Sequence, residues 1–159
     1  MHFKYLVEHL RDGVVIDSTI ETNLIPQQGL DHMLDVTCKG GSQVATWYVS
    51  IYEGDYTPIS TNTAANFPGL STECVAYDEA VRPTWVEGAI TAGAVDNSAS
   101  KAEFTINASK TIYGCALNSA AAKGATTGIL LSAVRFATPK AFVDNDVLRV
   151  TAPISLTAA

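Results

Sequence analysis

The stretch "FKYLVEHLRDGVVIDSTIET", residues 3–22, decides the fold class because it holds two strand patterns around one tight turn. Polar and apolar residues alternate over residues 3–10, and residues 14–22 form the returning strand. The Asp12-Gly13 pair between them is the dipeptide that a type I′ turn prefers. The sequence therefore begins with a predicted β-hairpin.

This hairpin, assigned to residues 1–22, carries two apolar stripes. They consist of Phe3, Tyr5 and Val7 on the first strand and of Val14, Ile16 and Ile20 on the second. Because a two-stranded hairpin alone is marginal in water, at least one stripe must be covered. We expect the hairpin to pair with the sheet of its own domain and to contribute one edge to an oligomer. The alternative is an external arm that clasps another chain.

One short helix is predicted in the region 24–37, over about residues 26–36. Pro26 suits a first helical position, Asn23 is placed to cap the helix, and Gly40-Gly41 ends it. Its apolar residues lie at i, i+3 and i+4 and are Leu30, Met33 and Leu34.

Downstream of the helix, short apolar runs alternate with clusters of Gly, Pro, Asn and Ser. The runs are 44–52, 73–78, 84–90, 102–107, 111–117, 129–136 and 147–156. Many short strands with frequent turns predict a mainly β protein: one domain over residues 1–159, with a β-sandwich over 44–157, jelly-roll-like or immunoglobulin-like, and one short helix. Residues 57–72 are predicted as a long loop.

In the last run, Leu148, Val150 and Ala152 share a face, which is the period of a half-buried strand. Pro153 cannot donate to a ladder, so we expect an edge strand or a bulge there.

Composition excludes several classes of protein. Of 159 residues, 47% are hydrophobic and only 16% are charged, so the chain can bury one ordinary core beneath a surface poor in charge. The net charge of −6 and the absence of Lys or Arg runs argue against nucleic acid as a partner. No apolar run is long enough to span a membrane, and the alternating amino terminus is unlike a signal peptide. We expect synthesis in the cytoplasm.

Candidate catalytic groups are few and scattered. The histidines are His2, His9 and His32, and only His32 has nearby carboxylates, Asp31 and Asp35, which fit a solvated helix face. His9 is expected at the surface. The sequence therefore predicts no enzyme, no cofactor and no metal site.

Two other segments resemble ligand loops only in part. Residues 144–146, "DND", lack the further oxygen ligands of a calcium loop and predict a tight turn. Residues 122–128, "AKGATTG", lack the order of a phosphate loop and predict a flexible connection.

Cys38, Cys74 and Cys115 are widely spaced and form no C-x-x-C pair. Buried free thiols are the favoured interpretation, with a single disulfide or an intermolecular bridge as the alternatives.

Aromatic residues gather in "TWYVSIYEGDYTP", residues 46–58. Strand alternation assigns Trp47 to the core and turns Tyr48 and Tyr52 to an exposed or interface side, while Tyr56 leaves with the loop. With Trp85, these tyrosines are candidates for stacking on sugars.

The order of the segments resembles that of small structural proteins of tailed bacteriophages and prophages, from about Phe3 to Leu156. The segments that carry the resemblance are "FKYLVEHLRDG", "NLIPQQGLDHMLDV", "TWYVSIYEGDYTP", "ECVAYDEAVRPTW", "NSASKAEFTI", "TIYGCALNSA" and "GILLSAVRF".

This resemblance implies a head decoration, or cement, protein that binds the major capsid protein on the capsid surface as a homo-oligomer, a trimer or a dimer. A tail-associated structural protein or a carbohydrate-binding module of the tail is the alternative. A reducing cytoplasm, where phage heads assemble, favours free thiols. Because aromatic anchors dominate protein interfaces, the candidate interface residues are Phe3, Tyr5, Tyr48, Tyr52, Tyr56 and Trp85.

Overall fold

The computed structural model describes residues 3–156. Residues 1–2, at the start of the predicted hairpin, and residues 157–159, at the end of the predicted domain, lie outside this range. Strands hold 43% of the structure and helices 12%, which confirms a mainly β fold. The strands are β1 (Lys4–Arg11), β2 (Val14–Thr22), β3 (Trp47–Tyr52), β4 (Glu73–Cys74), β5 (Thr84–Trp85), β6 (Ala94–Val95), β7 (Ala102–Thr105), β8 (Lys110–Asn118), β9 (Leu130–Phe142), β10 (Val147–Thr151) and β11 (Ile154–Ser155). The helices are α1 (Gln27–Leu34), which continues into a π-helical turn over Asp35–Lys39, and α2 (Phe67–Ser71).

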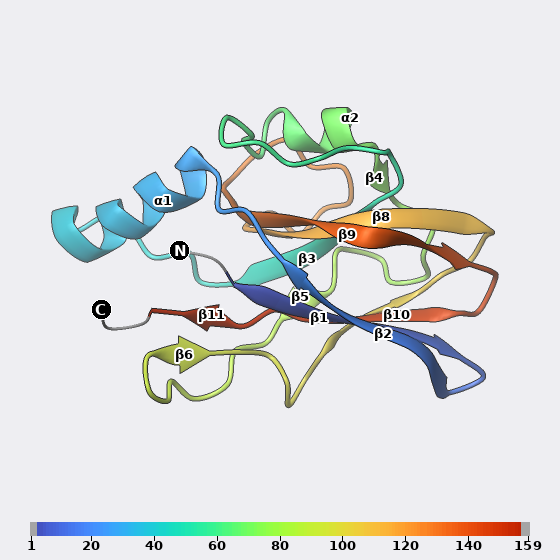
Figure 1. Cartoon of the computed structure of the whole chain (residues 1–159). Helices are drawn as coiled ribbons and strands as arrows, with labels where there is room; N and C mark the ends of the chain where they lie inside the picture. Colours follow the sequence, from blue (N-terminus) through green and yellow to red (C-terminus); the bar gives the residue numbers. More distant parts are fainter. Residues whose placement is uncertain (1–2, 157–159) are drawn as a thin grey trace.

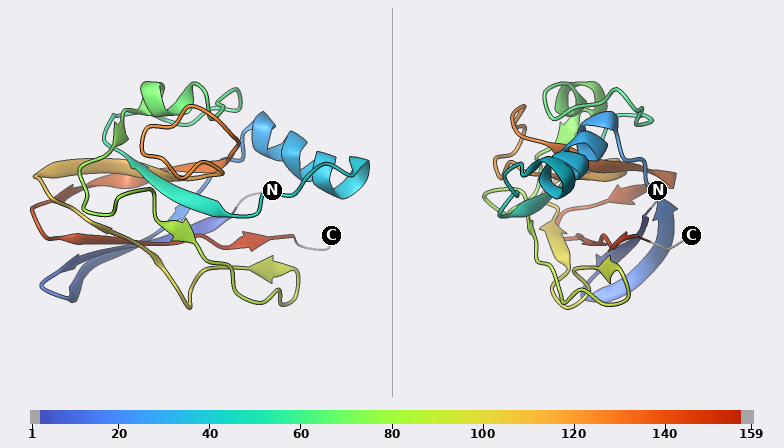
Figure 2. Two further views of the ribbon diagram at one scale, coloured as in Figure 1. Left: turned by 180° about the vertical axis from the view of Figure 1, so that it is seen from behind. Right: turned by 90° about the vertical axis from the view of Figure 1, so that its left-hand side faces the viewer.

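Two antiparallel sheets pack face to face and form the predicted sandwich (Figures 1 and 2). One sheet has the order β2-β1-β10-β7, and the other has the order β4-β3-β8-β9, with β5 also pairing with β3. The short ribbon of β6 and β11 lies at the end where α1 projects. The hairpin thus belongs to the sheet of its own domain, as expected.

The hairpin turn has the predicted geometry. Asp12 and Gly13 have φ values of 51° and 77°, the pair of positive angles that a type I′ turn requires. Close to the turn, the register slips: His9 lies opposite Asp17 whereas Leu10 lies opposite Val15. Ile16 is therefore the extra residue of a β-bulge on β2.

The core buries the first stripe of the hairpin. Phe3, Tyr5 and Val7 are at most 1% exposed and join the main hydrophobic cluster between the sheets. The Tyr5 hydroxyl lies 2.5 Å from the Ser132 hydroxyl of β9, so a hydrogen bond links the two sheets inside the core. Burying these side chains supplies the cover that the isolated hairpin lacks.

The two sheets approach each other on the side of β2 and β9 but do not close into a barrel. A single bridge joins Leu24 to Ala133, and the strands then separate. Between the pairs Gly114–Arg135 and Ile112–Lys140, β9 holds four residues against one in β8, so β9 bulges away from the ladder. The result is a curled half-barrel with β2 at its outer edge (Figure 2).

Helix α1 confirms the predicted helix, with one correction at its start. Pro26 is the N-cap rather than the first helical residue, and Asn23 does not cap the helix. Instead, Oδ1 of Asn23 accepts a hydrogen bond of 2.6 Å from the backbone N–H of Phe3, which ties the start of β1 to the end of β2. Gly40, at φ 73°, ends the helical segment as predicted.

The predicted loop over residues 57–72 contains the additional short helix α2. Two other predicted strands are much shorter than their apolar runs, because β4 ends at Cys74 and β5 at Trp85. Pro153 separates β10 from β11, and β10 is a central strand, so the expectation of an edge strand is wrong there.

Helix α1 packs closely on β9, and this contact yields a test of the fold. A Cβ atom at Gly29 would lie 2.3 Å from the backbone oxygen of Leu131, which cannot move without disturbing β9. We expect Gly29→Ala to lower the free energy of unfolding by about 1–3 kcal/mol in urea titrations. The matched control is Gly69→Ala in α2, where no atom lies within 4 Å of the added carbon. The control should be neutral or stabilising by up to ~1 kcal/mol; equal effects of both substitutions would contradict this packing.

Candidate functional site

The structure buries four of the six candidate interface residues. Phe3, Tyr5, Tyr52 and Trp85 are between 1% and 4% exposed, so no partner can contact their side chains in this fold. The expectation that they form an interface is wrong, because the two sheets and the covering loop use these aromatic rings as core. Tyr48 and Tyr56 are half-buried.

The strand alternation predicted an exposed or interface-facing Tyr52, and the structure shows why this prediction is wrong. Its face of β3 is covered by the segment that holds α2, which builds a second small core around Phe67, Ala116 and Ala133. The Tyr52 hydroxyl donates a hydrogen bond of 2.8 Å to the backbone oxygen of Val134. A face that would be exposed in a two-layer sandwich is thus interior here.

Tyr56 and Trp85 also serve the fold. The Tyr56 hydroxyl accepts a hydrogen bond of 2.9 Å from the Asn62 side chain, and its ring packs edge-on against Phe67. The indole N–H of Trp85 donates to the backbone oxygen of Ala152 at 2.9 Å. Because Trp85 is only 4% exposed, its ring does not offer the open surface for sugar stacking that the sequence predicted.

A buried cluster of charged groups lies at the hairpin end of the sandwich, and it corrects the surface position predicted for His9. The His9 side chain is 7% exposed, packs on the Phe142 ring at 4.0 Å between centroids, and places Nε2 2.8 Å from Oδ2 of Asp146. Arg11 donates to both carboxylate oxygens of Asp146 at 2.7 and 2.8 Å. Asp146 belongs to the tight turn predicted at residues 144–146.

The donors around Asp146 explain its ionisation. The hydrogen bonds from Arg11, together with those from the backbone N–H of Val143 and from His9, hold the pKa of Asp146 well below its usual range. Because every carboxylate oxygen is engaged, the group is unsuited to accept a proton from a substrate. The cluster fixes the hairpin to the turn before β10.

A second buried pair fixes the 122–128 connection. The Arg82 guanidinium, 1% exposed, donates to both oxygens of Glu73 and to the backbone oxygens of Ala120 and Ala125. Lys123 donates to the backbone oxygen of Tyr77 at 2.7 Å and lies over the Tyr77 ring. This segment is a connection, between β8 and β9, as predicted, but these contacts bind it to the body of the protein, which the predicted flexible connection did not include.

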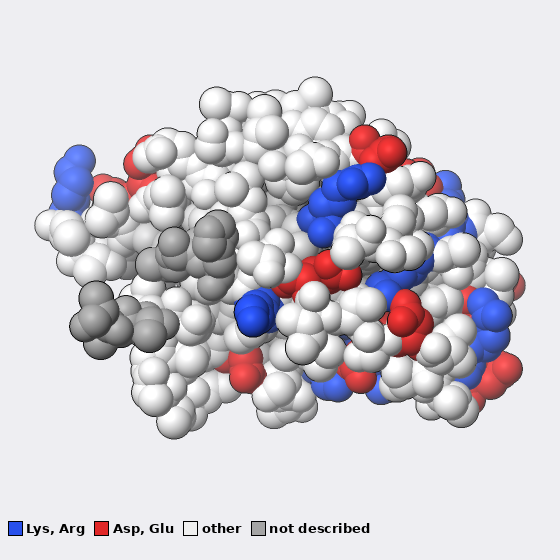
Figure 3. Space-filling model, in the orientation of Figure 1, with Lys and Arg blue, Asp and Glu red and all other residues white. Residues whose placement is uncertain are grey.

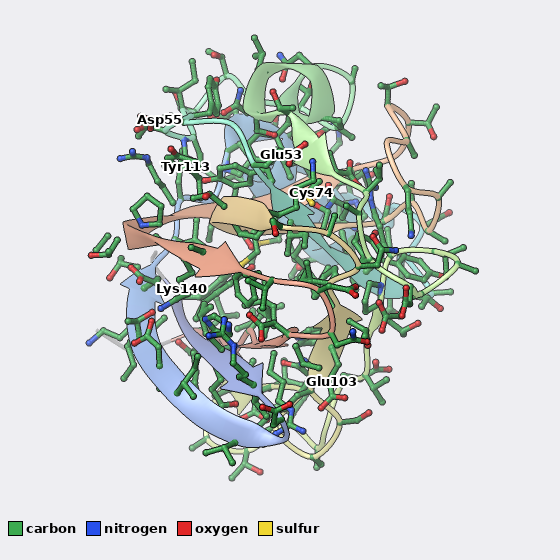
Figure 4. The ribbon with its side chains drawn as sticks, turned by 90° about the vertical axis from the view of Figure 1, so that its right-hand side faces the viewer. Glu53, Asp55, Cys74, Glu103, Tyr113 and Lys140 are labelled. Atoms are coloured by element: carbon green, nitrogen blue, oxygen red, sulfur yellow. The ribbon has the colours of Figure 1, made fainter. Side chains whose placement is uncertain are left out.

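The remaining acidic and histidine side chains do not converge. Across residues 3–156, no group of three or more His, Cys, Asp or Glu residues is placed to hold a metal ion. Of the acidic side chains labelled in Figure 4, Glu53 and Asp55 follow β3 in one segment, whereas Glu103 lies on the other sheet, at the opposite end of the view. His32 lies half-exposed on α1 with Asp31 and Asp35 exposed beside it, the predicted solvated helix face, while His2 is outside the described residues.

Two grooves flank residues 43–47, a feature that the sequence interpretation missed. The first, of about 200 Å³, lies between the helical segment and the sheets; its apolar lining is Met33, Val36, Val44, Trp47, Leu131 and Ile154. The second, of about 320 Å³, shares Val44, Trp47 and Ile154 and extends to Ile90 and Val95. Trp47, predicted as core, is half-buried between them. Their lining can contact apolar groups but brings no acid–base pair together.

The second stripe of the hairpin is exposed: Val14 is 62%, Ile16 50% and Ile20 69% exposed. Val15, on the same strand, is 44% exposed. They lie on β2, the end strand of its sheet. Figure 3 shows charged side chains interspersed with uncharged surface rather than gathered in a patch of one sign. The outer face of β2, which carries these four side chains, is therefore a candidate surface for contact with protein.

Comparison with protein-family models, with curated proteins and with solved structures finds no match to this chain. No helix among the described residues is long and apolar enough to cross a membrane.

The Asp146 cluster predicts a pH dependence of stability. We expect Asp146→Asn to lower the free energy of unfolding at pH 7 by about 2 kcal/mol, because charge-assisted hydrogen bonds are lost in a buried site. Since the folded-state pKa lies below the unfolded value of about 3.9, this contribution is complete above that pH and disappears as the pH falls through the folded-state pKa. Urea titrations at pH 7 and pH 3 should show the gap between variant and wild type narrowing in acid.

The control for this prediction is Asp144→Asn, at an exposed position in the same turn. It should leave stability nearly unchanged at both pH values. A gap for Asp146→Asn that stays constant between pH 7 and pH 3 would contradict the role given to its carboxylate.

The cysteines give a second prediction. All three are free thiols; Cys74 and Cys115 are buried, as expected, but Cys38 is exposed. Cys74 and Cys115 both lie opposite Ile51, on either side of β3, so their strands are about 10 Å apart, too far for a disulfide. Burial raises the pKa of both thiols. Alkylation measured by intact mass should give one addition to the native protein and three after unfolding, and a native count of three would refute the buried positions.

Proposed function

We propose that this protein is a structural protein of a tailed bacteriophage particle, and that it decorates the head by binding the major capsid protein on the capsid surface. The resemblance in segment order over residues 3–156 suggests this class. The observation that carries the proposal is the row of exposed β-branched side chains on the outer face of β2, the end strand of its sheet. An exposed apolar face is a liability for a freely diffusing protein and suits a permanent contact with protein.

The distribution of charge supports the same class. The Asp146 carboxylate and the Arg82–Glu73 pair are buried and engage their partners fully, while Arg11 reaches Asp146 from the surface, so these charges stabilise the fold. Charged residues are only 16% of the chain, and the protein therefore has a surface that can be covered without desolvating many charges.

The burial of Tyr52 and Trp85 weighs against the alternative of a carbohydrate-binding module of the tail. That alternative assigned sugar stacking to Tyr52, Tyr56 or Trp85, and the rings of Tyr52 and Trp85 are interior. A tail-associated structural protein uses the same kind of surface as a decoration protein, so location in the particle distinguishes the two.

The test adds purified protein to heads and, separately, to tails of particles that lack it. We expect saturable co-sedimentation with heads, a regular array on the capsid in cryo-electron microscopy, and a higher temperature of genome release, because a bound decoration protein stabilises the assembled lattice. Binding confined to tails, or no binding to either part, would contradict head decoration.

A further inference from the structure

Two grooves at the α1 end of the molecule share one apolar wall. They hold about 200 and 320 Å³ and have Val44, Trp47 and Ile154 in common. Helix α1 and the β6–β11 ribbon both lie at this end, opposite the turn of the β1–β2 hairpin (Figures 1 and 2). Ile90, which lines the larger groove, is 79% exposed. These Trp47 grooves can therefore accept apolar side chains from outside the chain.

Free backbone groups run beside the Trp47 grooves. Residues 42–45 belong to no helix or strand, and across the described chain no hydrogen bond engages their N–H or C=O groups. Ser42, Gln43 and Ala45 are exposed, so a partner can reach this stretch. An extended segment of another protein can hydrogen-bond to such a stretch while its side chains occupy neighbouring pockets.

The charge at this end is acidic and is not neutralised by ion pairs. None of the ion pairs found within residues 3–156 involves residues 24–47 or 86–100. The charged residues of these two ranges are four acids and one lysine: Asp31, Asp35, Glu87, Asp96 and Lys39. Glu87 is exposed and lines the larger groove with Trp47. A carboxylate without a basic partner beside an apolar groove favours a ligand that is both apolar and positively charged.

We propose that the Trp47 grooves bind an extended segment of a partner protein that carries apolar side chains next to Lys or Arg. The apolar side chains enter the grooves at Trp47 and Ile90, the backbone of the segment pairs with residues 42–45, and its basic group lies near the Glu87 carboxylate. The Trp47 ring also attracts a cation held over its face. This inference goes beyond the proposed function, because no residue of β2 lines the grooves and no capsid is needed.

The probe for this site is the peptide acetyl-Leu-Ser-Leu-Ser-Lys-amide, because alternate residues of an extended peptide share one face. Titration into isotope-labelled protein, followed by NMR, should shift the amide signals of residues 42–45 and 87–90 and the indole signal of Trp47. Signals of the interior strand β8 should not move. Matched peptides end in Gln or in Glu instead of Lys. The lysine peptide should bind about two- to fivefold more tightly than the glutamine peptide, and the glutamate peptide should bind most weakly.

Two variants separate the charge from the apolar contact. Glu87→Gln should abolish the preference for the lysine peptide, whereas Asp144→Asn, at an exposed position in the turn before β10, should keep it. Ile90→Ser should weaken all three peptides by about threefold or more, because apolar contact area is lost. Its control is Leu70→Ser, at an exposed position on α2, which should change nothing. Because Glu87 and Ile90 are exposed, both variants should keep the urea midpoint of wild type.

The hexylammonium ion, an apolar cation without a peptide backbone, tests the pairing with residues 42–45. It should bind at least about fivefold more weakly than the lysine peptide, since it lacks the backbone hydrogen bonds. Equal binding by this ion would overturn the assignment to an extended segment. The inference is also overturned if the lysine peptide shifts no signal at residues 42–45 and 87–90, or if its advantage over the glutamine peptide survives Glu87→Gln.

Discussion

The backbone N–H of Ala137 is bound by the Glu21 carboxylate at a place where a closed barrel would have a bond between strands. At this point a side chain, rather than a neighbouring strand, accepts the hydrogen bond from β9. Most of the architecture follows from this arrangement. Because β9 bulges between Arg135 and Lys140, it cannot follow β2, and the sheets stay joined only at Leu24 and Ala133. The gap is closed by Glu21 and by the ion pair of Asp17 with Lys140, and the outer face of β2 stays exposed.

The two strands of the hairpin use their apolar residues differently. The stripe of Phe3, Tyr5 and Val7 fills the core, and the stripe on β2 faces outward. Since the interior aromatic rings are used for folding, the surface offered to partners is β-branched rather than aromatic.

Local sequence patterns predicted the elements that depend on neighbouring residues. The turn at Asp12-Gly13, the end of the helical segment at Gly40 and the alternation that buries Leu148 and Val150 all follow from backbone preferences within a few residues. Long-range packing accounts for the errors. Tyr52 is buried because a distant loop covers its face, and His9 is buried because Asp146, 137 residues away, provides its partner. Strand order and the grooves at Trp47 likewise depend on contacts that no local pattern contains.

The central claim is that the exposed outer face of β2 is covered when the protein binds the head. Backbone amide hydrogen exchange, followed by mass spectrometry, measures this directly on dilute protein and on protein bound to heads. Peptides covering residues 14–22 should become more protected on binding, because a covering partner suppresses the local opening of β2. Peptides from the interior strand β8 should be protected in both states. Unchanged exchange across residues 14–22, with protection appearing elsewhere on the surface, would contradict this account.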